Sequence, residues 1–316
     1  MSNVPLDKIE LVAEVNGQQE RVISLNIGLT VYFPIPFSSC LDAIYHLLNV
    51  YLTRVDWSTF KFQNLSGTAK GYKKIAPSAR PTIVDWMERK RRYGSACTIW
   101  LKDQQSTTDA ADNLVDLFAR DVATKEFDSN YLRILFPRNI IEQHGRNSFL
   151  EWICNMLAPV PYYSAHLGYT LGTSTLLQVS PFSTLMNERL YAVGKRFLGV
   201  EIEKPHLENY EMKKFTRSPG WVTFLSNDLL VQVGGIESLK KSLQGDFGYM
   251  ATKFGGGIRA GELPQVGDRN RQENALVEQR ALAGKLEPLY SPMPAKLFSN
   301  KEHEETLAWL RRLLQE

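Results

Sequence analysis

The sequence has few cysteines, no long apolar run and no strong excess of charge of either sign. Its 316 residues include only 3 cysteines, Cys40, Cys97 and Cys154, and these form no Cys-x-x-Cys pair. Such a sparse, odd set provides neither a disulfide framework nor a zinc ribbon, and it fits a reducing compartment. No stretch approaches the roughly 18 apolar residues of a membrane-spanning helix, and no basic region precedes an apolar run at the start. We therefore expect a cytoplasmic protein without a signal peptide.

The balance of residue types is that of an ordinary globular protein. Hydrophobic residues make up 43% of the chain and charged residues 22%, so the chain should bury a substantial core. The net charge of +3 is too small to argue for nucleic-acid binding by itself. The length allows one large domain or two ordinary ones. We expect a single compact domain over residues 1–316, with two lobes meeting near the Pro-rich turn at 158–161 as the alternative.

Hydrophobic spacing alternates irregularly between strand and helix periods along the chain. Asn16-Gly17 between two apolar runs favours a hairpin, and Ser38 and Ser39 stand where an N-cap would precede a helix. The segment 114–122 fits either a helix or a strand. The expected strands are 9–15, 22–33, 97–101, 131–136, 162–171, 221–225 and 247–254, and the expected helices are 41–55, 81–94, 147–157, 181–197, 237–245 and 300–316. This order predicts an α+β fold with a mixed, largely antiparallel sheet, amphipathic helices and a C-terminal helix.

The stretch KFGGGIRAGELPQVGDRN at 253–270 resembles a phosphate cradle at first sight. Its Gly255–Ala260 segment matches G-x-G-x-x-A, but a dinucleotide site requires a helix directly afterwards, and Gly261-Glu262-Leu263-Pro264 starts a helix poorly. A P-loop would need lysine where Glu262 stands. The favoured interpretation is that these glycines allow positive φ or close backbone approach at a turn or bulge. A nucleotide-binding enzyme or sensor using Gly255–Gly261 is the alternative.

Catalytic patterns are missing from the rest of the chain. None of the 5 histidines pairs with another at helical spacing, and neither a His-Glu-x-x-His nor a Gly-x-Ser-x-Gly motif occurs. Cys40 and Cys154 fall on apolar helical faces, where structural burial is commoner than nucleophilic chemistry. We therefore predict no catalytic residues, no metal site and no cofactor.

Two segments carry local charge of opposite sign. Residues 70–92 contain eight basic against two acidic side chains, interleaved with Tyr72, Trp86 and Tyr93, and residues 103–128 contain seven acidic against two basic ones. The plainest interpretation is two solvated surfaces. The basic segment could instead form a nucleic-acid-binding module. The acidic segment could dock on a basic, DNA-gripping surface of another protein.

The second half of the chain resembles a known family. SPGWVTFLSNDLLVQVGGIESLKKSL, the glycine-rich stretch and ALAGKLEPLY together resemble the TsiV family of type VI secretion immunity proteins, associated with effectors that carry a VRR-type nuclease domain. The match is strongest over 219–290. The residues that carry this structural signature are Gly220, Trp221, Gly234, Gly235, Gly256, Gly257, Gly261, Pro264, Gly267 and Asp268.

The resemblance implies a cytoplasmic immunity protein that is not an enzyme. Such a protein would bind a cognate type VI secretion toxin, a nuclease, and neutralise it by occluding its active site, with no cofactor, no membrane contact and no direct nucleic-acid contact. Asp109, Asp112 and Asp116 are the predicted effector interface, because they form the nearest acidic cluster for a cationic partner surface. Self-association is possible, although the sequence contains neither a heptad nor an exposed strand that would establish it.

Overall fold

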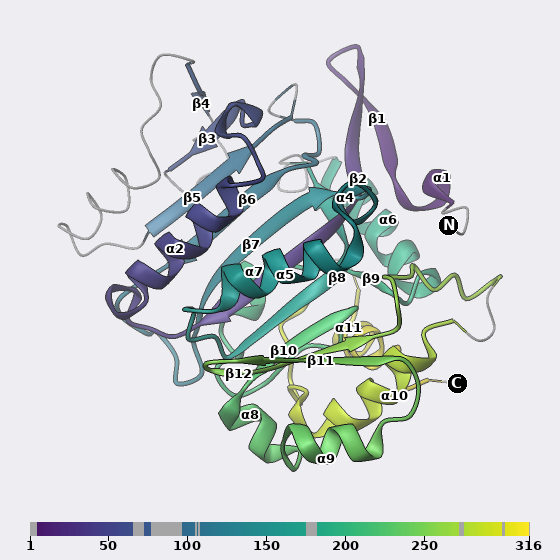
Figure 1. Ribbon diagram of the computed structural model, residues 1–316. Coiled ribbons are helices and arrows are strands. Elements are labelled where there is room, and N and C mark those ends of the chain that lie inside the picture. The colour runs from purple at the N-terminus through teal and green to yellow at the C-terminus, as the bar shows by residue number, and fades with distance from the viewer. Residues whose placement is uncertain are drawn as a thin grey trace.

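A computed structural model describes residues 5–65, 73–76, 97–104, 106, 108–174, 182–271, 275–298 and 301–315. Within them one 12-stranded sheet runs through the molecule (Figure 1). Its strands are β1 (Leu11–Val15), β2 (Gln18–Phe33), β3 (Phe62–Asn64), β4 (Lys73–Lys74), β5 (Cys97–Lys102), β6 (Leu114–Ala119), β7 (Asn130–Pro137), β8 (Ser164–Thr173), β9 (Val200–Glu201), β10 (Val222–Ser226), β11 (Phe247–Thr252) and β12 (Gly255–Ala260).

The strand order is β11-β12-β10-β8-β2-β7-β6-β5-β3-β4, with β1 paired to β2 and β9 paired to β8. Neighbours are antiparallel except β8 and β9, which are parallel. The long strand β2 joins the two halves, because β7 pairs along one of its edges and β8 along the other. The predicted α+β class with a largely antiparallel sheet is confirmed.

Helices lie on both sides of this sheet. The α-helices are α1 (Leu6–Ile9), α2 (Leu41–Leu52), α4 (Ile140–His144), α5 (Arg146–Leu157), α6 (Phe182–Arg196), α7 (Pro205–Glu208), α8 (Asn227–Gln232), α9 (Gly235–Ser242), α10 (Val277–Leu286) and α11 (His303–Leu310). Short 3-10 helices occur at η1 (Phe37–Ser39), η2 (Trp57–Thr59) and η5 (Glu287–Leu289). None of the helices in the described ranges is long and apolar enough to span a membrane.

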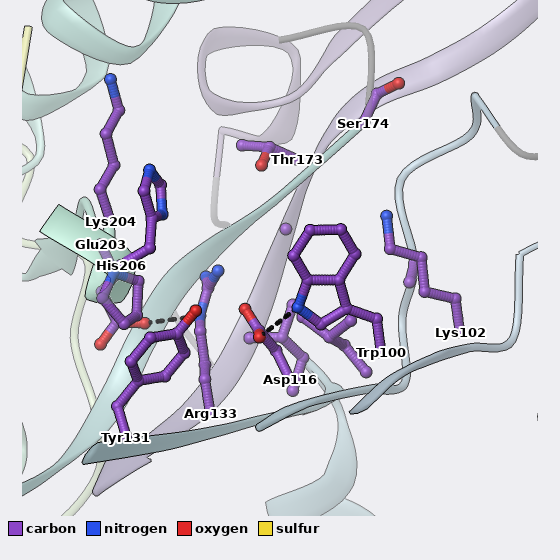
Figure 2. Close-up of a pocket in the computed structure, with 15 residues that line it drawn as sticks. Trp100, Lys102, Asp116, Tyr131, Arg133, Thr173, Ser174, Glu203, Lys204 and His206 are labelled. Carbon is purple, nitrogen blue, oxygen red and sulfur yellow. Dashed lines mark hydrogen bonds and ion pairs between the residues drawn. The ribbon is translucent and has the colours of Figure 1, made fainter. Parts of the chain in front are cut away.

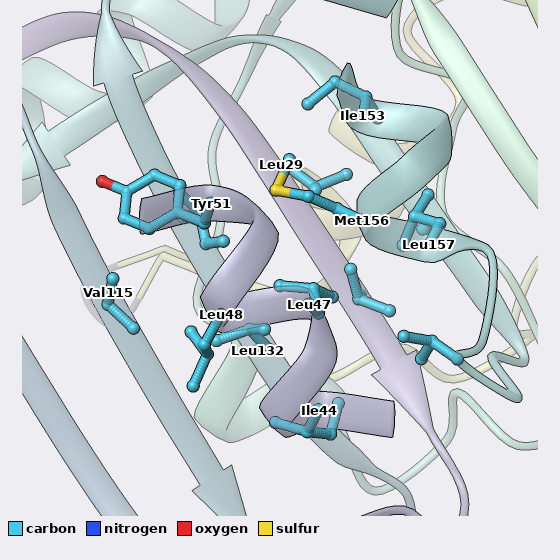
Figure 3. Packing of buried hydrophobic residues seen from close by; sticks show 14 of the residues in the cluster. Leu29, Ile44, Leu47, Leu48, Tyr51, Val115, Leu132, Ile153, Met156 and Leu157 are labelled. Carbon is cyan, nitrogen blue, oxygen red and sulfur yellow. The ribbon is translucent and has the colours of Figure 1, made fainter. Parts of the chain in front are cut away.

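The largest hydrophobic cluster lies between the sheet and the helices α2 and α5. The apolar positions of both helices recur at three- and four-residue spacing, so each helix presents one apolar stripe to the strands. Tyr51 of α2 stacks on Trp152 of α5, with ring centroids 6.0 Å apart. Figure 3 shows how the two helices meet the strands through Leu29, Ile44, Leu47, Leu48, Tyr51, Val115, Leu132, Ile153, Met156 and Leu157.

Two further clusters cover the ends of the sheet. Near the N-terminal hairpin, α6 packs Met186 and Leu190 with Ile23 and Leu25 of β2. At the other end, Leu225 and Ile258 of the strands β10 and β12 are covered by apolar residues of α8, α9 and α10. The elements over this second end come from the segment in which the family resemblance is strongest.

Most of the predicted elements form close to their expected bounds. The hairpin turn has Asn16 and Gly17 at φ 52° and 78°, the left-handed pair that a tight two-residue turn requires. The ambiguous segment 114–122 contains the strand β6. The expected N-cap at Ser38 or Ser39 is wrong, because these residues close η1 and Cys40 precedes α2. The expected helix at 81–94 lies outside the described residues.

Candidate functional site

A row of mostly polar side chains crosses the sheet on the face opposite α2 and α5. Residues directly opposite in an antiparallel register share a face, and the registers place one such residue on each strand from β5 to β10. Because a strand alternates its side chains between two faces, apolar neighbours such as Leu29 and Leu132 point to the core instead. The row consists of Trp100, Asp116, Arg133, Thr30, His166 and Thr223.

A pocket of about 110 Å³ opens over the β5 end of this row. This volume exceeds that of a few water molecules, at roughly 30 Å³ each, and would admit the end of a polar side chain. Figure 2 shows the Trp100 indole, the Asp116 carboxylate and the Arg133 guanidinium converging on its floor, with Tyr131 beside them. Lys102 stands on one side of the pocket, and Lys204 and His206 stand on the other.

Asp116 is the central acidic group of the pocket. Its Oδ1 accepts a hydrogen bond of 2.6 Å from Nε1 of Trp100. Burial raises the pKa of Asp116 to about 6, against the opposing influence of Arg133, the Trp100 hydrogen bond and Lys102. A carboxylate kept in such surroundings costs folding free energy, and groups of this kind concentrate at functional sites.

Arg133 is held in place by a carboxylate and a backbone carbonyl. Its Nε lies 2.9 Å from Oε2 of Glu203, and one Nη donates to the carbonyl of Leu171 at 2.7 Å. Burial alone would raise the pKa of Glu203, but the positive charges of Arg133 and Arg217 outweigh that effect and lower it. The positive charge of the Arg133 guanidinium is therefore compensated within the chain by the Glu203 carboxylate.

A buried ion network continues from Glu203, which itself lines the pocket. Arg217, only 1% exposed at its side chain, lies 3.0 Å from Glu201, 3.2 Å from Glu203 and 3.2 Å from Glu208. Glu201 also contacts Arg312 near the C-terminus at 2.5 Å. These contacts tie the chain after β9 to the C-terminal helix, so the network positions one wall of the pocket.

The remaining cations of the pocket are perturbed as well. Lys102 is buried, and burial lowers the pKa of its ammonium group to about 8, while Asp116 and Asp109 act in the opposite direction. Burial also lowers the pKa of Lys204, whose Nζ donates to Oδ1 of Asn187 at 3.3 Å. The pocket thus combines a carboxylate of raised pKa with two ammonium groups of lowered pKa.

The structure separates the three predicted interface residues. Asp116 lies in the pocket, whereas Asp109 and Asp112 belong to the segment before β6, whose Ala111 lines the same pocket. The side chain of Asp112 is 43% exposed and pairs with Arg21 at 2.8 Å. Two of the predicted acids therefore lie near the rim of the pocket and one lies within it.

Other acids of the segment 103–128 serve the local fold. Asp103 accepts hydrogen bonds from the backbone amides of Asp112 and Asn113 at 3.0 and 2.9 Å. Asp128 is buried and accepts from the amides of Thr124 and Lys125. Because these carboxylates accept hydrogen bonds from nearby backbone amides, the acidic segment does not present one continuous acidic face.

The glycine-rich stretch has a different structure from the one expected. Gly255, Gly256 and Gly257 lie inside β12 and pair with β10 on one side and β11 on the other, not in a turn or bulge. Their amides belong to a ladder between two strands, and no helix follows them directly, so Gly255, Gly256 and Gly257 do not form the phosphate-binding loop that the nucleotide-binding alternative requires. Only Gly261 and Gly267 in the stretch have positive φ, at 81° and 62°.

The other signature residues surround this strand. Trp221 is buried just before β10, and Gly234 and Gly235 begin α9 with φ 83° and 84°. Asp268 receives two hydrogen bonds from Arg196, at 2.9 and 2.8 Å. Pro264 lies in the loop between β12 and Asp268.

Of the basic segment 70–92, only residues 73–76 are described, and Lys73 and Lys74 there form the exposed strand β4.

Sequence reasoning missed Trp100, Arg133, Glu203 and Lys102. A usable signal was present for Arg133, which interrupts the otherwise apolar run YLRILF at a position that a two-sided buried strand would fill with an aliphatic residue. Glu203 gave no such signal, because its role depends on a pairing with Arg133 and Arg217 across long sequence distances.

Comparison with known proteins identifies the family and a structural neighbour. The model of the TsiV family, described as type VI immunity for VRR-NUC, matches residues 39–313. The chain belongs to the TsiV family. A Pseudomonas aeruginosa type VI secretion system protein, PA0821, has the same fold with a TM-score of 0.77 at 17% identity, covering 96% of this chain and 87% of that one. Among curated proteins none matches this TsiV chain.

Metal-binding chemistry finds no support in the described part of this TsiV protein. Within those ranges no three histidine, cysteine, aspartate or glutamate side chains group so as to hold a metal ion. The three cysteines form no disulfide bond, and Cys40 and Cys97 are buried while Cys154 is half-buried.

Proposed function

We propose that this TsiV protein neutralises a cognate VRR-NUC effector by direct binding, without catalysis of its own. The family match over residues 39–313 carries the proposal. The inhibitor acts stoichiometrically from the cytoplasm, and residues 1–316 form the single unit that binds. The burial of the Asp116 carboxylate in a pocket with Trp100 and Arg133 is costly, and this supports the pocket as part of the binding surface.

The rim and floor of the pocket form the proposed interface. Asp109 and Asp112 flank Ala111 of the pocket lining and bring carboxylates to the rim, with Asp112 paired to Arg21. Trp100 and Arg133 supply an aromatic and an arginine at the floor, the residue types that dominate binding energy in interfaces. A nuclease holds the phosphates of its substrate with cationic groups. An acidic rim that docks on those groups occludes the active site because it competes for the same surface.

Co-expression tests immunity itself. A candidate VRR-NUC effector, sought among the genes that neighbour this one, is produced in a bacterial host with and without the immunity protein, and survival and co-purification are measured. Rescue of growth with recovery of a complex is the expected result. A chain that neither binds the effector nor restores growth would refute the proposed function.

The interface needs a separate comparison. Asp112→Lys is compared with Glu237→Lys, a matched charge reversal on the exposed side of α9, where the glutamate side chain is 71% exposed. The proposal expects the first variant to weaken the complex and the second to leave it unchanged. If both variants bind equally well while immunity persists, the effector contacts another surface.

A further inference from the structure

The ends of the sheet differ in how their edges are protected. Proteins commonly blunt edge strands with charges, proline or very short length, because an open edge recruits further strands. At one end of the described sheet, β4 is two exposed lysines. The hairpin strand β1 carries the exposed Glu14. At the opposite end β11, with the sequence FGYMAT, has neither a charge nor a proline over six residues.

The backbone groups of β11 that face outward can be identified from its register. The amide of Gly261 donates to the carbonyl of Asp246 at 2.9 Å, so this pair is hydrogen-bonded. Bonded pairs recur at every second position of an antiparallel ladder, which places Gly248, Met250 and Thr252 toward β12. The N–H and C=O groups of Tyr249 and Ala251 therefore point away from the sheet, and no backbone partner for them exists within the described residues.

Both faces of β11 are already covered. Met250 and Thr252 point to the side of α5, where Sδ of Met250 lies 3.6 Å from Sγ of Cys154 and Thr252 hydrogen-bonds Tyr162. Phe247 and Tyr249 point to the other side and pack against the cluster of α8 and α9. Side chains on both faces of β11 are thus engaged within the chain, and the outward backbone groups at its edge remain for a partner (Figure 1).

We propose that β11 pairs with β11 of a second copy of this chain, antiparallel about a two-fold axis near Tyr249. In that arrangement Tyr249 faces its own counterpart and Phe247 faces Ala251, so the outward groups of each copy meet those of the other. The strand is flanked by Asp246, 47% exposed at its side chain, and by the exposed Lys253. In the antiparallel arrangement Asp246, which is paired with Arg259 of its own copy, stands opposite Thr252, and Lys253 stands opposite Gly245. No like charges face one another there, whereas in-register parallel pairing would place each of these charges beside its own counterpart.

The dimer leaves the effector pocket open. The pocket lies over β5, β6 and β7, and β11 is separated from those strands by β12, β10, β8 and β2. One continuous sheet would then carry a pocket on either side of the two-fold axis, so each dimer binds two effectors. A single six-residue edge buries less surface than a standard interface, and association in the micromolar range is expected.

Sedimentation equilibrium of the full chain between about 5 and 500 µM tests the pairing, since weak association appears only as concentration rises. Ala251→Pro removes an outward N–H without removing a bond to β12, and Ala251→Lys adds a charge to the edge. Each is expected to raise the dimer dissociation constant at least tenfold. Val12→Lys is the matched control, because Val12 is an exposed apolar residue, 55% exposed, on β1.

Three results would overturn the proposal. The first is that the chain stays monomeric throughout the concentration range. The second is that the Ala251 variants dimerise like the unmodified protein, and the third is that Val12→Lys disrupts the dimer instead. Circular dichroism establishes that each variant is folded, and if Ala251→Pro is not, Ala251→Lys decides. A monomer whose β11 amides become protected from hydrogen exchange only on effector binding would assign the edge to the effector. Immunity by co-expression is measured separately, so a failed dimer and a failed immunity function are distinguished.

Discussion

Trp221 and Gly261 are joined by a hydrogen bond of 3.1 Å from the indole Nε1 to the carbonyl oxygen. The amide of Ala260 also donates to the carbonyl of Trp221 at 2.8 Å. These bonds connect two parts of the family signature that stand far apart in the sequence. These signature residues therefore contact one another around β10 and β12, and the glycines that resembled a ligand loop in the sequence lie in a paired strand.

Replacement of Gly257 should destabilise the protein far more than replacement of Gly256. A Cβ on Gly257 would lie 2.5 Å from Cε1 of Phe224, whereas a Cβ on Gly256 would meet only ordinary contacts at 3.5 Å and beyond. Gly257→Ala should cost about 1–3 kcal/mol through overpacking, and Gly256→Ala less than about 1 kcal/mol. Urea unfolding measures both. Equal losses would indicate that space around the strand is not the cause.

Of the two reasons that the sequence suggested for these glycines, close approach of neighbouring atoms applies at Gly255 and Gly257, and positive φ does not. Neither Gly256 nor Gly257 has positive φ, so a side chain at these positions is limited by neighbouring atoms and not by the backbone conformation. Gly255 is tighter still, because a Cβ there would lie 1.9 Å from the carbonyl oxygen of Leu225.

Asp116→Asn should stabilise the protein at neutral pH. The folded-state pKa of about 6 exceeds the ordinary value of 3.8, so the folded state holds its proton more tightly than the unfolded state. The resulting penalty is complete above pH 6, at about 3 kcal/mol, and diminishes as the pH falls from 6 toward 3.8. The asparagine oxygen can still accept the Trp100 hydrogen bond. The unfolding free energy should therefore rise at pH 7.5.

The pH dependence provides the control for that variant. The advantage of Asp116→Asn over the unmodified protein should shrink by about two thirds between pH 7.5 and pH 4.5, because the unmodified carboxyl is then protonated when folded. An advantage that is independent of pH, or a loss of stability at pH 7.5, would show that burial of the charge is not costly.

Much of the fold could be predicted from the sequence because it depends on local patterns. The Asn16-Gly17 turn, the apolar stripe of α2 and the alternation around 131–136 are each encoded within a few residues. The strand β12 was not predicted, since a run of glycines has low strand propensity and is fixed only by its two neighbours. Pairing with β10 and β11 outweighed the low strand propensity of glycine in this segment.

Most of the pocket could not be predicted either, because it too depends on pairing between distant parts of the chain. Asp116 was singled out for its charge alone, yet its environment depends on Trp100 in register across β5 and on Arg133 across β7. Glu203 reaches Arg133 from a different part of the chain, and no local pattern indicates that contact. Strand registers and long-range ion pairs, not residue types, determine which acids of 103–128 enter the pocket.

Removal of Arg217 should be severely destabilising. Arg217→Met leaves Glu201, Glu203 and Glu208 buried without the guanidinium that they share, at an expected cost of about 3–5 kcal/mol near pH 7.5. The deficit should narrow as the pH falls, because the stranded carboxylates then acquire protons. Lys240→Met, which breaks the exposed pair with Glu237, should cost less than about 1 kcal/mol. Thermal unfolding at pH 5.5 and 7.5 compares them, and a similar loss in both variants would contradict a special role for the network.

Charge reversal at the rim should act on the rate of effector association. Asp109→Lys and Asp112→Lys change the sign of the field that a cationic nuclease surface meets, so the association rate constant should fall about tenfold at low salt and become less sensitive to ionic strength. Asp112→Asn separates the charge from the loss of the Arg21 contact at 2.8 Å, and it should give a smaller decrease. Stopped-flow binding at two salt concentrations measures these rates. If a folded Asp112→Lys variant associates at an unchanged rate, the interface does not include the rim. A change confined to the dissociation rate would indicate that the rim contacts the effector without accelerating its association.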